Sequence, residues 1–235
     1  MADMASSTDT TGGDALFDAE EEKTFLTGRP QRKFATPKPL DRHGPATIIS
    51  MVNQKGGVGK TTSTINLGAS LVEQGRKVLL VDLDPQGALS AGLGTAHDDD
   101  QLTVYDLLFD NTASVHAAIR HSKVSGLDLV PANIDLSAAE IQLVNEVGRE
   151  QTLARALRPV RNEYDFIFID CGPSLGLLTV NALAASHGVI IPMEGEYYSL
   201  RGLALLTDTV EKVRDRINFD PVSYTHLTLP TNREV

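Results

Sequence analysis

A glycine-rich turn at Lys55–Thr62, with the sequence KGGVGKTT, constrains the fold of this chain more than any other feature. It follows the apolar run Thr47–Val52, which predicts a strand, and it leads into a helical pattern over Thr61–Gln74. Glycines let backbone N–H groups point into one concave surface, and the helix that follows adds free N–H donors and its positive end. Strand, glycine turn, Lys-Thr and helix together predict a loop that binds phosphate. The alternative is an ordinary turn with lysines facing solvent, and the flanking strand and threonines disfavour it.

The loop departs from the general pattern G-x-x-x-x-G-K-[ST], because Gln54 stands at the first glycine position and a second lysine, Lys55, follows it. Lys60 is expected to reach the β- and γ-phosphates of a nucleotide, and the Thr61 hydroxyl is expected to bind Mg²⁺. The other residues predicted to bind the nucleotide from this loop are Lys55, Gly56, Gly57, Val58, Gly59 and Thr62.

Composition sets the class of protein in which this loop lies. The chain has 235 residues, 41% of them hydrophobic, which is enough for one domain with a substantial core. No apolar run approaches the roughly 20 residues that span a bilayer, and we expect no signal peptide. Cys171 is the one cysteine, so no intrachain disulfide can form, and a reducing cytoplasm is expected. The net charge of −10 argues against a uniformly basic nucleic-acid binder but allows a local basic patch.

Strand and helix patterns alternate along the chain after the loop, which predicts an α/β fold with a parallel sheet flanked by helices. The segment 88–94, rich in small residues, is expected to be a loop. The further predicted strands are 77–82, 127–130, 164–170 and 189–192, and the further predicted helices are 104–109, 135–147, 152–157, one through Val180 and Leu183, and 200–217.

Carboxylates end two of the predicted strands. Asp82 and Asp84 follow one strand and Asp170 ends another, and ligands of α/β sheets bind at this edge. Near a triphosphate, such carboxylates can hold Mg²⁺ or orient the attacking water. For the first pair, the alternative is a helix cap and a turn residue before proline. Gly172 is placed to approach the γ-phosphate, and Cys171 is expected to be a small buried residue rather than a nucleophile.

Both ends of the chain differ in composition from its centre. Residues 1–45 are acidic and then rich in proline and basic residues, which predicts a disordered tail and an extended linker. Residues 222–235 resemble one reading frame of a transposon-derived sequencing adaptor, although their composition would also suit a strand. We therefore expect residues 46–221 to form the native domain, incomplete at its C-terminus, and residues 222–235 to be foreign.

Residues 46–221 resemble the ParA/Soj family of chromosome- and plasmid-partitioning ATPases, also called deviant Walker ATPases. The motifs that carry this resemblance are 55–62, VDLDPQG at 81–87, FIDCGPS at 168–174, and 192–206 with Glu196-Tyr197-Tyr198. The resemblance implies a phosphate-loop NTPase fold that uses ATP and Mg²⁺.

The resemblance also implies a role for individual residues. Lys60 would bind the phosphates, Thr61 the Mg²⁺, and Asp170 the outer shell of the metal. Asp84 would orient the hydrolytic water. Lys55 would correspond to the signature lysine of the family, which reaches the partner subunit's nucleotide in an ATP sandwich dimer. Ala88 stands where many relatives carry asparagine.

The partners that the resemblance implies are a second copy of the chain with ATP, a ParB-like protein, and DNA bound non-specifically through the missing C-terminal portion, with no membrane. The expected place is the bacterial cytoplasm, on the nucleoid. A membrane-associated spatial regulator similar to MinD is the alternative, and the Asp84-Pro85-Gln86 sequence favours the partitioning branch. An electron carrier similar to nitrogenase reductase is disfavoured, because its bridging cluster takes two cysteines per subunit.

Overall fold

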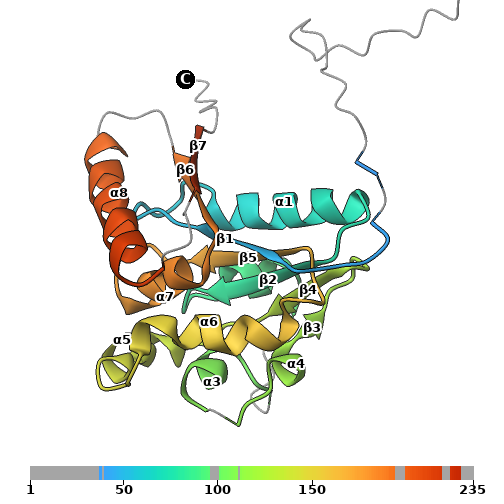
Figure 1. Ribbon diagram of the computed structural model, residues 1–235, viewed down its shortest axis with the longest axis horizontal. Coiled ribbons are helices and arrows are strands. Elements are labelled where there is room, and N and C mark those ends of the chain that lie inside the picture. Colours follow the sequence, from blue (N-terminus) through green and yellow to red (C-terminus); the bar gives the residue numbers. More distant parts are fainter. Residues whose placement is uncertain are drawn as a thin grey trace, which may run out of the picture. The chain divides into compact units, whose positions relative to one another are not determined.

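The computed structural model describes residues 37–38, 40–95, 101–110, 112–193, 199–218 and 223–228 (Figure 1). All of the helices and strands among them belong to the unit Lys38–Val235. Residues 1–36 and 39 of the predicted tail lie outside the described residues, and so does the motif Glu196-Tyr197-Tyr198.

The centre of the fold is one sheet, which has seven strands in the described part of the chain, in the order β3-β4-β2-β5-β1-β6-β7. Neighbouring strands are parallel except for β3 and β4, which pair antiparallel. This confirms the predicted parallel sheet, to which the sequence pattern had not assigned the two-residue β3. The strands are β1 Thr47–Met51, β2 Val78–Leu83, β3 Arg120–His121, β4 Leu127–Val130, β5 Phe166–Cys171, β6 Gly188–Met193 and β7 Ser223–Thr228.

Helices cover both faces of the sheet, as its buried parallel strands require. In Figure 1, α1 lies along one face, and α3, α5, α6 and α7 lie on the other. The helices are α1 Lys60–Glu73, α2 Ala88–Gly92, α3 Val104–Phe109, α4 Val115–Ala118, α5 Leu136–Leu143, α6 Thr152–Leu157, α7 Leu177–Ala185 and α8 Ser199–Arg216, with short 3₁₀ turns η1 Arg149–Gln151 and η2 Arg158–Val160.

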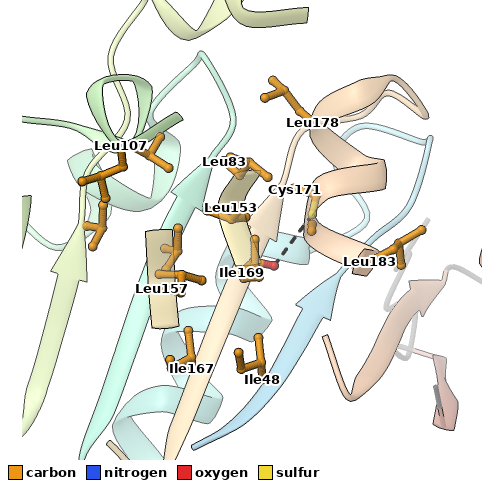
Figure 2. Packing of buried hydrophobic residues seen from close by; sticks show 14 of the residues in the cluster. Ile48, Leu83, Leu107, Leu153, Leu157, Ile167, Ile169, Cys171, Leu178 and Leu183 are labelled. Carbon is orange, nitrogen blue, oxygen red and sulfur yellow. Dashed lines mark hydrogen bonds between the residues drawn. The ribbon is translucent and has the colours of Figure 1, made fainter. Parts of the chain in front are cut away.

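Along β1, β2, β5 and β6, alternate residues enter two separate apolar clusters, one on each face of the sheet. On β5, Phe168 packs in the smaller cluster, which includes residues of α1, whereas Ile167 and Ile169 pack in the larger one. Figure 2 shows Ile167 and Ile169 among leucines from α6 and α7, with the buried Cys171 close by. The Cys171 thiol donates to the Ile169 carbonyl at 3.9 Å, and burial raises its pKa, so its predicted character as a small buried residue is confirmed.

Two of the predictions, one of a loop and one of a helix end, were wrong. The segment 88–94, expected to be a loop, begins with α2, because Ser90 donates both its backbone N–H and its hydroxyl to the buried Asp82 carboxylate. The helix expected to reach Val147 ends at Leu143, and Val147 is 91% exposed. Arg149 donates to the Val144 carbonyl at 2.7 Å and so satisfies an acceptor just beyond the helix end.

At the other side of the sheet, β7 pairs in parallel with β6 from Gly188↔Ser223 to Met193↔Thr228. Residues 223–228 therefore form a strand, which the composition of this segment also suits. Strand pairing reports on hydrogen bonding and not on origin, so the foreign origin of residues 222–235 stays a prediction.

Asn181 of α7 is fully buried and connects α7 to the segment 149–153, which contains η1 and the start of α6. Its side-chain oxygen accepts from the Leu153 N–H at 3.2 Å, and its amide donates to the Arg149 and Leu177 carbonyls at 2.7 and 2.9 Å. The Leu153 N–H lies in the first turn of α6, where backbone donors have no partner within the helix. One amide side chain therefore serves as a cap for α6 from a different helix.

We expect Asn181→Ala to lower the free energy of unfolding by about 1–3 kcal/mol, because the buried Leu153 N–H would lose its partner, while the Arg149 carbonyl would keep the Thr152 hydroxyl at 3.4 Å. Urea unfolding followed by circular dichroism measures this loss. Asn145→Ala, which changes an exposed asparagine, is the matched control and should stay within about 0.5 kcal/mol of the parent. Equal losses in the two variants would contradict the capping role.

Candidate functional site

The candidate site forms where three adjacent strands end. Since β5 pairs with β1 on one side and β2 on the other, the loop after β1, the acidic turn after β2 and Asp170 on β5 meet at one edge of the sheet. In register, Asp170 lies opposite Met51 on β1 and Asp82 on β2. Parallel sheets bind ligands at this carboxyl edge.

The loop after β1 has the shape that anion binding needs. Gly57 and Gly59 have φ of 76° and 84°, a region that favours glycine, and α1 begins directly after Gly59. A side chain built at Gly56 or Gly57 would meet no atom within 4 Å, so the space in front of the loop is open. Among the described residues no side chain caps α1, which leaves its first N–H groups as donors for a bound phosphate.

Asn53, which the sequence reasoning missed, holds the start of this loop. Its side-chain oxygen accepts from the Lys55 N–H at 2.9 Å, and its amide donates to the Pro192 carbonyl at 2.6 Å. An asparagine that bonds the backbone two residues on is a common turn former, and this was the signal available in the sequence. Asn53 thus fixes the loop to the end of β6. Lys55 itself is exposed.

Lys60 is the buried cation of the site. Its side chain is 7% exposed, and its ammonium donates to the Lys55 carbonyl at 3.4 Å. Burial lowers the pKa of Lys60, and the carboxylates of Asp170 and Asp84 oppose that shift. An ammonium has three donors, so the group can also bind the oxygens of a phosphate that approaches through the loop.

Asp170 is the buried carboxylate next to Lys60. The Thr64 hydroxyl lies 3.4 Å from an Asp170 oxygen and 3.0 Å from the Lys60 carbonyl, and the Thr61 hydroxyl bonds to Asp170. Burial raises the pKa of Asp170 to about 6, against the lowering effects of the Thr61 hydrogen bond and the charge of Lys60. The predicted proximity of Thr61, Lys60 and Asp170 is therefore seen in the structure, and Thr64 joins them as a contact that the sequence reasoning had not assigned.

Asp82 and Asp84 have different surroundings although one residue separates them. Asp82 is fully buried, and its oxygens accept from the Ser90 N–H at 2.9 Å, the Ser90 hydroxyl at 2.7 Å and the Asp84 N–H at 3.2 Å. Burial raises its pKa. These hydrogen bonds give Asp82, predicted as a metal ligand, a role in shaping the turn that carries Asp84.

Asp84 lies at the surface of the site, half-buried. One of its oxygens accepts from the Gln86 N–H at 3.0 Å. A Cβ placed on Gly172 would lie 3.4 Å from the same carboxylate, so the loop after β5 approaches Asp84 closely. The structure thus brings Asp84 and Gly172 together, as their positions at adjacent strand ends predict.

The donors at this edge suit a nucleotide with Mg²⁺. In the described part of the chain, no group of three or more His, Cys, Asp or Glu side chains could hold a metal ion by itself. Mg²⁺ in nucleotide sites needs no such cage, because phosphates and waters supply most of its ligands. A hydroxyl from Thr61, a carboxylate from Asp170, the Lys60 ammonium and an open glycine loop fit that requirement.

Comparison with known proteins identifies this arrangement. A family model described as an AAA domain matches residues 46–221. The chain is 53% identical over 173 residues to the sporulation initiation inhibitor protein Soj of Bacillus subtilis, and the match covers 74% of this chain and 68% of that protein. The chain belongs to the ParA/Soj family.

Two further matches extend this comparison. An uncharacterised protein of Mycobacterium tuberculosis is 67% identical over 193 residues, which is 82% of this chain but 61% of the relative, so the chain spans less than two thirds of that protein. A solved structure of cobyrinic acid a,c-diamide synthase from Mycobacterium smegmatis, with a bound ATP analogue and magnesium, is 41% identical with a TM-score of 0.74. That match covers 81% of this chain and 77% of the other.

The pKa of Asp170 gives a test of the site in the absence of nucleotide and metal. Its pKa is raised from 3.8 to about 6, so between these values the folded chain holds a proton that the unfolded chain releases. Stability due to this group is therefore present below about pH 4 and is lost as the pH rises through about 6. A shift of about two units corresponds to about 3 kcal/mol.

We therefore expect the stability of Asp170→Asn, relative to the parent, to rise by about 2–3 kcal/mol between about pH 4 and about pH 7. Urea unfolding of both proteins across this range, with EDTA present, measures the difference. If the substitution only removed the carboxylate beside Lys60, the difference in stability between the two proteins would be the same at every pH in this range. A difference that is flat across the range would contradict the buried, proton-holding carboxylate.

Proposed function

We propose that this chain is the nucleotide-binding part of a Mg²⁺-dependent ATPase that acts in chromosome or plasmid partitioning. The observation that carries the proposal is the placement of the buried Lys60 and Asp170 beside an open glycine loop, with Asp84 at its rim. Family membership supports the same chemistry. The ATP analogue and magnesium named for the Mycobacterium smegmatis structure support the cofactors.

In the proposed site, each residue has a distinct task. Lys60 binds the β- and γ-phosphates. The backbone N–H groups of Gly57–Thr62, which include the first turn of α1, bind phosphate oxygens. Thr61 and Asp170 would hold the Mg²⁺, and Asp82 would support the turn that carries Asp84. The metal supplies positive charge that neutralises the phosphates. Gly172 places a backbone N–H near the γ-phosphate.

Asp84 orients the water that attacks the γ-phosphate. Its carboxylate has about four acceptor positions, of which the Gln86 N–H takes one, so it retains acceptors for a water molecule. Its place beside Gly172 brings that water to the end of the phosphate chain. Hydrolysis then returns the protein to its ADP state.

On the scale of the whole protein, we propose an ATP-gated switch. ATP promotes a homodimer in which Lys55 reaches the partner subunit's nucleotide, the dimer binds DNA non-specifically on the bacterial nucleoid in the cytoplasm, and a ParB-like protein stimulates hydrolysis, which resets the switch. The names of two further relatives, a chromosome-partitioning ATPase Soj of Treponema pallidum and a chromosome partitioning protein ParA of Myxococcus xanthus, support this proposal over the alternative similar to MinD. Among the described residues, no helix has the length and apolar character needed to cross a membrane.

Lys60 and Asp84 should separate binding from hydrolysis. Lys60→Ala should abolish measurable binding of Mg²⁺–ATP, because the phosphates lose their main cation. Asp84→Ala should keep ATP affinity within about threefold of the parent and lower kcat about 10²-fold or more, as expected for a water-orienting group. Calorimetry and phosphate release measure the two effects, and Lys123→Ala, an exposed lysine in the turn before β4, is the control. ATP affinity in Lys60→Ala equal to that of the parent would refute the phosphate-loop assignment.

Lys55 should act across the dimer. We expect Lys55→Ala to bind ATP with nearly parental affinity as a monomer but to lose ATP-dependent dimerisation, because the γ-phosphate charge is no longer neutralised when the interface excludes water. Analytical ultracentrifugation with and without Mg²⁺–ATP measures this, in an Asp84→Ala background that prevents turnover. A Lys55→Ala dimer of undiminished strength would show that the lysine does not act in trans.

A further inference from the structure

The loop that links β5 to α7, residues 172–176, begins beside Asp84. The Gly172 backbone lies close enough to the Asp84 carboxylate that a Cβ there would be 3.4 Å from it. Gly172 is buried, whereas Pro173 and Ser174 are exposed. The geometry at Asp84 therefore depends on what holds the other end of this loop.

The other end of the loop is the start of α7, and its contact comes from a different helix. Gly176 is the N-cap of α7, which has no side-chain cap and no acidic residue in its first turn. Glu140 of α5 places its carboxylate directly against Gly176, so that a Cβ there would overlap both carboxylate oxygens. Ser174 of the same loop donates its hydroxyl to Glu140 at 3.3 Å.

A carboxylate in this position is favourable for a physical reason. The nine-residue helix α7 has its positive end and its unpaired N–H groups at Leu177, beside Gly176. Glu140 brings a negative charge to that end without belonging to α7. The supporting helix α5 is itself fixed, because Leu136, Ala139 and Leu143 are fully buried in the main core.

The space beside the loop explains why such a contact would matter. A cavity of about 310 Å³ lies between α5 and the loops after β2 and β5. Its lining includes Asp84, Glu140, Gly172 and Ser174. A loop that borders a cavity can shift into it, because no packed side chains oppose the movement. Glu140 lines this cavity and contacts the loop at Ser174 and Gly176, and the Thr179 hydroxyl of α7 donates to the Ser174 carbonyl at 2.6 Å.

We propose that Glu140 is a positioning residue that holds the 172–176 loop, and through it Gly172, in register with Asp84. Neither the motifs nor the comparisons assign a role to this side chain. The proposal rests on the proposed function, in which Gly172 meets the γ-phosphate and Asp84 orients the water. Since ADP has no γ-phosphate, Glu140 should affect ATP binding and hydrolysis much more than ADP binding.

Two independent substitutions remove the contact. Glu140→Ala deletes the carboxylate. Gly176→Ala leaves Glu140 in the sequence but displaces its carboxylate, and its backbone φ of −82° is one that alanine adopts without strain. Alanine is less favourable than glycine at an N-cap, so the part of the Gly176→Ala loss that persists in the Glu140→Ala background belongs to the cap, and the remainder belongs to the displaced carboxylate.

The experiment is a double-mutant cycle in the full chain with two readouts. Hydrogen exchange of the 172–177 segment, measured by mass spectrometry without nucleotide, reports on the loop. The ratio of Mg²⁺–ATP to Mg²⁺–ADP affinity, measured by calorimetry, reports on its function. We expect each single variant to speed exchange in this segment and to lower the ratio about 5- to 10-fold with ADP affinity unchanged. The double variant should be no worse than either single one.

Glu146→Ala, which removes an exposed glutamate just after α5, is the matched control and should match the parent in both readouts. Additive effects of Glu140→Ala and Gly176→Ala, or unchanged exchange in both, would overturn the link between Glu140 and the loop. If the two substitutions have non-additive effects on hydrogen exchange but leave the ratio of Mg²⁺–ATP to Mg²⁺–ADP affinity unchanged, the positioning role is overturned. A parent chain that binds no ATP would instead refute the proposed function, and the exchange cycle would still decide the link, since it uses no nucleotide.

Discussion

The pairing of β5 between β1 and β2 is the constraint on which the site depends. These two pairings bring the glycine loop, the acidic turn and Asp170 to one edge, although they are far apart in the sequence. Each strand is buried on both faces, so its register cannot slip without moving apolar side chains out of the two clusters. The positions of the charged groups are therefore set by the packing of the apolar ones.

Burial also explains the electrostatics of this edge. Lys60, Asp82 and Asp170 are all at most 7% exposed, and desolvation is the largest cause of the pKa shift of each. Asp82 is supported by hydrogen bonds from Ser90 and Asp84, whereas Asp170 is bonded by threonines of α1. A bound Mg²⁺–nucleotide would bring both signs of charge into this region, which makes ligand binding and protonation at Asp170 thermodynamically linked.

Residues outside the recognised motifs set the geometry of the loops. Asn53 fixes the glycine loop to β6, Ser90 bonds to Asp82, and Glu140 contacts the segment before α7. Each acts on the backbone or on another side chain, and none of the three was itself predicted to contact a ligand. Specificity and turnover in this family fold would therefore depend on such supports as well as on the motif residues.

The sequence by itself determined the fold class, the phosphate loop and the candidate residues Lys60, Asp84 and Asp170, because local periodicity and glycine-lysine spacing carry that information. It also predicted 104–109, 127–130 and 152–157 with the bounds that α3, β4 and α6 have. Only the tertiary structure decided that Asp82 faces Ser90, that α5 ends at Leu143, and that Glu140 lies against Gly176. Glu140 and Gly176 are distant in sequence, so no local pattern could pair them. Asp82 and Ser90 are only eight residues apart, but the hydrophobic periodicity of the sequence does not encode which buried carboxylate meets which donor.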